Sequence, residues 1–121
     1  MKTLAALISL MIPALIATTA QAADPLYSQP AGQCTQAFSG QLMSITDNAT
    51  LTSEVTRRMD HAVQVAEDPR WINSSRPTFT WANETKAACG IASGYLKSAY
   101  RDDEFVSKCE CFHERMVEYM N

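Results

Sequence analysis

The sequence predicts an all-α fold, a small four-helix bundle-like domain cross-linked by two disulfides behind a cleaved signal peptide. Three observations support this prediction. Apolar residues recur at helical spacing along most of the chain, four cysteines lie in a short domain, and the chain begins with an apolar run. We divide the chain into a signal peptide at 1–22, an extended lead-in at 23–33 and a single helical domain at 34–121.

The first residues have the features of an export signal. Lys2 supplies a positive start, residues 4–17 are apolar, and small residues at Ala20 and Ala22 suit a signal peptidase. The apolar run is too short to span a bilayer, and Cys34 lies well beyond the expected cut. We therefore expect no membrane anchor in the mature chain and a periplasmic location, with secretion as the alternative.

The first two predicted helices follow from their apolar spacing. Phe38, Leu42 and Ile45 suggest a short first helix, and residues 51–66 predict a longer second one. The apolar stripe of the second helix consists of Leu51, Val55, Met59, Ala62, Val63 and Ala66. We expect it to end at Asp68, because a proline disfavours helical geometry in the residue before it.

The region after Pro69 is predicted to be irregular as far as Trp81. Residues 78–81 alternate Thr with aromatic residues, a period of two that suggests a brief extended segment. We expect the third helix to begin with Asn83 as its N-cap and to continue to Ala99. Small residues recur four apart on it, at positions 90, 94 and 98, which suggests close approach of another segment.

The last helix is predicted to follow a tight turn at Arg101-Asp102. Acidic residues at 102–104 suit the positive end of its dipole. Its apolar stripe consists of Phe105, Cys109, Phe112, Met116 and Met120. We therefore expect the last two helices to form an antiparallel hairpin.

Charge and motif content exclude several functional classes. Without Lys2, the mature chain has nine basic residues (10 − 1) against thirteen acidic ones, so no polybasic surface for nucleic acid or anionic lipid is expected. The chain has two histidines and lacks a nucleophile elbow, a phosphate-binding glycine loop and a zinc-protease motif. We predict no enzyme and no cofactor.

The cysteines are predicted to form two disulfides. Cys109 and Cys111 lie two apart, so on a helix they point about 200° apart and cannot share one ion. Cys111 is expected on the polar side of the helix, beside an acidic ladder (Glu110, Glu114, Glu118). The like charges of this ladder could be offset by a basic partner, but a solvated face is the simpler interpretation. Hairpin register favours Cys89 with Cys111, whereas side-chain direction favours Cys89 with Cys109. We give priority to side-chain direction, because a Cβ that points away cannot form the bond. The predicted disulfides are therefore Cys89 with Cys109 and Cys34 with Cys111.

Two alternatives retain chemistry at these sulfurs. Cys109 and His113 share a helix face and could bind copper or zinc if the thiol were free. The simpler interpretation is that His113 is an ordinary boundary residue. A thiol redox protein is the second alternative, although Cys-x-Cys within a helix departs from the usual Cys-x-x-Cys at a helix start.

One segment has the composition of a partner-binding surface. It contains Arg70, Trp71, Arg76, Phe79 and Trp81, residue types that are enriched where proteins bind each other. The simpler interpretation is that the two tryptophans cover one end of the bundle. We predict a non-catalytic exported helical protein that binds another protein, of inhibitor, immunity or accessory-subunit type.

Overall fold

The computed structural model describes Cys34 and residues 40–121, and all regular structure in this part of the chain is helical. The helices are α2 (Gln41–Ser44), α3 (Asn48–Glu67), α4 (Pro69–Ile72), α5 (Thr78–Lys97) and α6 (Asp103–Met120). The predicted all-α class is confirmed. The predicted signal peptide and lead-in lie outside the described residues.

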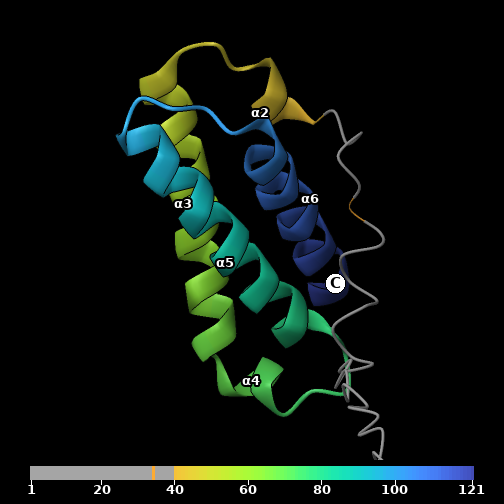
Figure 1. Cartoon of the computed structure of the whole chain (residues 1–121). Coiled ribbons are helices and arrows are strands. Elements are labelled where there is room, and N and C mark those ends of the chain that lie inside the picture. The colour runs from red at the N-terminus through yellow and green to blue at the C-terminus, as the bar shows by residue number, and fades with distance from the viewer. Residues whose placement is uncertain (1–33, 35–39) are drawn as a thin grey trace, which may run out of the picture.

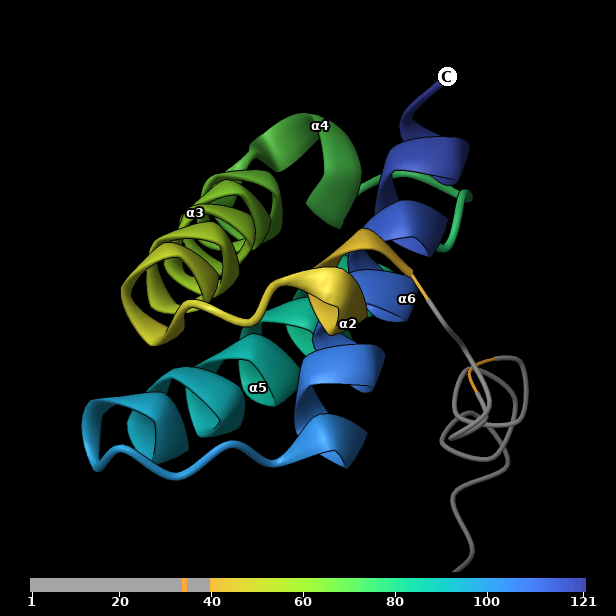
Figure 2. The ribbon, with the colours of Figure 1, turned by 90° about the horizontal axis from the view of Figure 1, so that it is seen from above.

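Three long helices form the body of the molecule, and α5 packs against both α3 and α6 (Figure 1). α3 and α6 touch each other less extensively than either touches α5. The short α2 lies against α6, and α4 lies at the end where α3 is joined to α5 (Figure 2). The core lies between these helices, and its largest fully buried apolar side chains are Leu42, Leu51, Val55, Leu96, Val106 and Met116.

The first predicted helix is represented by one turn among the described residues. This turn, α2, follows Gly40 and buries a single side chain, Leu42. One turn makes too few hydrogen bonds to be stable alone, so α2 depends on contacts with the rest of the protein. The predicted four-helix bundle is not confirmed, because the described body contains three long helices and two single turns.

The bounds of α3 follow from side-chain capping. The carboxylate of Asp47 accepts a hydrogen bond from the Thr50 amide at 2.7 Å, which satisfies a free donor of the first turn. The last helical residue is Glu67, and Asp68, before Pro69, is the C-cap, so the helix stops where the proline predicted. The chain then makes the single turn α4, so the start of the segment predicted to be irregular is helical.

The predicted start of α5 is wrong. The helix begins at Thr78 rather than after Asn83, and residues 78–81 are helical rather than extended. The Trp81 amide donates to the Pro77 carbonyl at 3.0 Å, and the buried residues of this part, Thr78, Trp81, Ala82 and Thr85, follow a helical period. Four residues of Thr-aromatic alternation cannot distinguish the two periods, and packing of Trp81 into the core favours the helix.

The predicted hairpin of the last two long helices is confirmed. α5 ends at Lys97, and Ala99 just beyond it lies in the left-handed region, at φ 57°. Tyr100 N donates back to Tyr95 O at 3.0 Å. α6 then begins after Asp102, whose side chain accepts from the Phe105 amide at 3.1 Å. The hairpin therefore has a standard cap on both sides of its turn.

Two disulfides cross-link the fold, in the pairing that side-chain direction predicted. Cys89 of α5 bonds Cys109 of α6, and Cys34 bonds Cys111. All four residues are at most 3% exposed. One disulfide thus joins the hairpin, and the other fixes the chain ahead of α2 to the opposite side of α6.

This attachment buries a helix face that was predicted to be solvated. Glu110 is 1% exposed, and its carboxylate accepts from the backbone amides of Gln41 at 2.6 Å and Leu42 at 2.9 Å. Gly40 allows this approach, since a Cβ there would lie 2.3 Å from the Glu110 carboxyl carbon. The prediction of an exposed acidic ladder is therefore wrong for Glu110, which anchors the first turn of α2.

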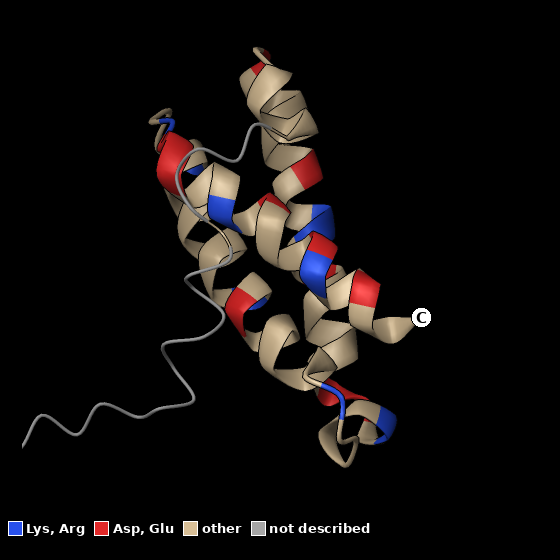
Figure 3. Cartoon of the chain, turned by 90° about the vertical axis from the view of Figure 1, so that its right-hand side faces the viewer, with Lys and Arg blue, Asp and Glu red and all other residues tan. Residues whose placement is uncertain are grey.

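Figure 3 marks the positions of acidic and basic residues, and both kinds occur along the helices without separating into one acidic and one basic region. Among the described residues, no helix has both the length and the hydrophobicity needed to cross a bilayer.

Candidate functional site

The structure divides the predicted partner-binding residues between the core and the surface. Trp81 is 4% exposed and packs against Phe112, with ring centroids 5.8 Å apart. Trp71 is half-buried against the core, beside the exposed guanidinium of Arg70. Trp81 is therefore a core residue and is removed from the candidate surface. Composition alone could not show that Trp81 is buried, because a tryptophan within a helix can lie either in the core or at a binding surface.

The remaining residues of the predicted surface lie on a segment that is fastened to the end of α6. The Arg76 guanidinium donates to the carbonyls of Tyr119 and Asn121, and the Thr78 hydroxyl donates to Tyr119 O at 2.9 Å. These bonds satisfy carbonyls that a helix C-terminus leaves free. The connection between α4 and α5 is therefore held in place, and Ile72 at the end of α4 and Phe79 in the first turn of α5 are exposed on either side of it.

A histidine pair connects α3 to α6, although the two residues are 52 positions apart. His61 Nδ1 and His113 Nε2 are separated by 2.9 Å, which is hydrogen-bond distance. The ring centroids are 5.1 Å apart and the planes are inclined by 63°, so the rings meet in a T-shaped arrangement. Sequence analysis treated the two histidines separately, since only the packing of α3 on α6 brings them together.

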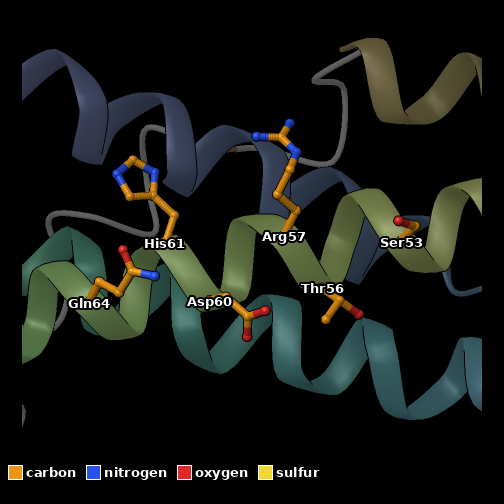
Figure 4. A pocket seen from close by; sticks show the side chains of 6 residues that line it. All are labelled: Ser53, Thr56, Arg57, Asp60, His61 and Gln64. Carbon is orange, nitrogen blue, oxygen red and sulfur yellow. The ribbon is translucent and has the colours of Figure 1, made fainter.

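Two surface hollows share His61 of this pair as a lining residue. The larger, with a volume of about 650 Å³, is lined by Ser53, Thr56, Arg57, Asp60, His61 and Gln64 of α3. Arg57 and His61 extend on the side where α6 lies, whereas Thr56 and Asp60 extend on the side of α5 (Figure 4). The smaller hollow shares His61 and Gln64, and its other lining residues are Val65, Asp68, Arg70, Trp71 and Met120.

The surroundings of His113 favour its neutral form. Burial, followed by the nearby His61, Arg58 and Arg57, lowers the pKa of His113 to about 4. Two neutral rings can share one N–H between the facing nitrogens, which suits the short separation. At neutral pH the pair therefore acts as a hydrogen-bonded contact between helices.

The geometry gives no support to the metal alternative. The Cys109 sulfur is bonded to Cys89, so it is not a free thiolate for copper or zinc. Among the described residues, no three His, Cys, Asp or Glu side chains converge on one point. The redox alternative also lacks an accessible sulfur, because both disulfides are buried.

The outer face of α5 is uncharged between residues 87 and 96 and is only partly covered by described residues of the chain. Residues 87–96 carry no charge, and Ile91 and Tyr95 are 43% and 40% exposed. Tyr100, just beyond the helix, is 57% exposed and meets Tyr95 edge to face. The close approach expected at the small residues is absent at Gly94, where no described atom lies within 4 Å of a built Cβ. At Gly90 the nearest atom is Met59 Sδ, at 3.8 Å.

No family model, curated protein or solved structure matches the chain.

Proposed function

We propose that the chain is an exported, non-catalytic helical protein that binds another protein in the periplasm, as an inhibitor, immunity protein or accessory subunit. Its partner would contact the outer face of α5. The redox and metal alternatives are weaker, since all four cysteines are in buried disulfides.

The observation that carries this proposal is the distribution of apolar residues around α5. A helix on a protein surface normally has one apolar side, whereas a helix that is apolar all round is normally buried. α5 buries Ala88, Ala92 and Leu96 on its inner side, and still presents Ile91 and Tyr95 outward. Tyrosine is enriched at protein interfaces, where its ring is buried and its hydroxyl finds a partner.

A rigid scaffold supports this interpretation. A helix fixed by a disulfide loses little freedom on binding, so less of the interaction free energy is spent on ordering it. Cys89 lies on the inner side of α5 and is bonded to α6. The outer face is therefore presented in one orientation. The exposed segment with Arg70, Ile72 and Phe79 would be a second contact region at one end of the helix.

The experiment that tests the proposal is capture of a partner on the immobilised oxidised protein from periplasmic and extracellular extracts, followed by mass spectrometry. Ile91→Arg and Tyr95→Ser should each abolish or strongly reduce capture, because they place a charge or remove an aromatic ring at the interface. Ala49→Arg adds the same charge at an exposed position of α3 and should capture normally.

Far-ultraviolet circular dichroism would check that each variant retains its helices. If the α5 variants capture a protein as well as the unmodified chain does, the outer face of α5 is not the interface. The variants Arg70→Ala and Phe79→Ala would then show whether the other exposed segment carries the binding.

A further inference from the structure

The histidine pair lies between the two parts of the fold that no disulfide joins. One disulfide connects α5 to α6, and the other connects Cys34 to α6. α3 is included in neither. At its start, Asn48 Nδ2 donates to Leu96 O at 3.3 Å, and farther along the helix His61 meets His113. α3 is therefore the long helix that neither disulfide restrains.

The geometry of the pair limits how many protons it can hold. With both rings neutral, one facing nitrogen donates and the other accepts. One added proton leaves this arrangement intact, because a protonated ring can still donate to a neutral one. A second added proton puts an N–H on both facing nitrogens, so that no acceptor remains at 2.9 Å and two positive charges face each other.

We propose that the His61–His113 pair is an acid-sensitive latch, which opens the seam between α3 and α6 when both imidazoles are protonated. The disulfides keep α5, α6 and the Cys34 segment together during this change. The opening is therefore local to α3, and it enlarges the two hollows that meet at His61.

The other charged groups around the pair add to this response. Arg57 and Arg58 lie on the His61 side and are both paired with Glu54. Hydrogen bonds from Arg57 and Arg58 lower the pKa of Glu54 to about 2, so this carboxylate keeps its charge and stays paired with both guanidinium groups between about pH 7 and about pH 4. Burial raises the pKa of Glu114 on α6, so this carboxylate loses its charge earlier in acid, which adds to the positive charge of the protonated rings. The charged side chains that face the pair or its hollows are Arg57, Arg58 and Asp60 of α3, Asp68 and Arg70 at α4, and Glu114 of α6.

Hydrogen exchange measured by mass spectrometry tests the latch on the oxidised protein between about pH 7 and about pH 4, with rates corrected for intrinsic pH dependence. We expect the protection of residues 57–67 to fall about tenfold relative to that of α5. The double variant His61→Gln/His113→Gln keeps a polar pair that cannot charge, so its α3 should remain protected. His113→Lys places a permanent cation against His61 and should loosen α3 at neutral pH.

Two results would overturn the proposal. One is loss of α3 protection to the same extent in the glutamine variant, and the other is simultaneous loss in α3 and α5 of the unmodified protein. If the glutamine variant does not fold, nuclear magnetic resonance titration of the two imidazoles in the unmodified protein decides the matter. A latch requires two separated, coupled steps, and two independent titrations at the ordinary histidine pKa would exclude it.

Discussion

α3 and α6 lie on either side of α5, and they are held by different kinds of interaction. α6 carries both disulfide attachments and the buried carboxylate of Glu110. α3 is held by its buried apolar stripe and by the contact of His61 with α6. The two helices are held differently because the segments attached to them differ in how much apolar surface they bury. α3 buries enough side chains to pack without help, whereas the short α2 on α6 buries only Leu42.

The role of the disulfides at α6 is tested most directly by removing one of them at a time. In the chain-entropy model, closing the loop of 77 residues between Cys34 and Cys111 stabilises the fold by about 4 kcal/mol. The 20-residue loop between Cys89 and Cys109 contributes about 3 kcal/mol. Urea unfolding of the two double Cys→Ala variants should show this order, and a larger loss for the Cys89/Cys109 variant would contradict it.

The next largest effect is expected at the carboxylate that anchors α2. Gln in place of Glu110 retains one acceptor oxygen, so one of the two amides of α2 loses its partner and faces an NH₂ group. We expect Glu110→Gln to lower the free energy of unfolding by about 2 kcal/mol. Glu114→Gln changes an exposed carboxylate on the same helix and should lower it by less than about 0.5 kcal/mol.

On the α3 side, stability is expected to depend on pH through the histidine pair. The folded-state pKa of His113 is about 4, below its ordinary value of 6.5, so the unfolded chain takes up the proton first as the pH falls. The contribution of His113 to the free energy of unfolding is fully present above about pH 6.5 and is lost as the pH approaches 4.

For a group that keeps contact with water, we expect this loss to be on the order of 1 kcal/mol. Urea midpoints across this range should fall more steeply for the unmodified protein than for His113→Gln. Parallel curves would show that His113 does not contribute.

Two glycines in opposite surroundings provide a further contrast. Gly94 faces open space in the middle of α5, so Gly94→Ala should raise the free energy of unfolding by up to about 1 kcal/mol. Gly40 lies against the Glu110 carboxylate, so Gly40→Ala should lower it by about 1–3 kcal/mol. Thermal unfolding of both variants measures the contrast, and a stabilised Gly40→Ala protein would contradict the tight anchoring of α2.

Local rules predicted much of this fold. The end of α3 at Asp68, the turn before α6 and the pairing of the cysteines all follow from neighbouring residues or from the direction of a side chain on a helix. The start of α5 was mispredicted, because the position of Trp81 depends on a core that sequence spacing does not describe. The exposure of Glu110 was mispredicted because α2 covers it from about 70 residues away.

In the candidate sites too, features that depend on the packing of distant segments could not be predicted from the sequence. Composition selected Arg70, Trp71 and Phe79, but it could not place Trp81 inside the protein. The meeting of His61 with His113 depends on the packing of two helices and has no local signal. The uncharged run at 87–96 was visible in the sequence, yet an outward-facing apolar side is recognisable only once the inner side of α5 is known.

The bond between Cys34 and Cys111 also changes how the protein would respond to a protease. Every connection between the described helices lies within the covalent ring that this bond closes, including the exposed stretch 73–77. A single cut at any of these connections therefore releases no fragment, and the two pieces stay tied through sulfur. Such a nicked molecule would migrate as one species on a denaturing gel and separate into two only after reduction.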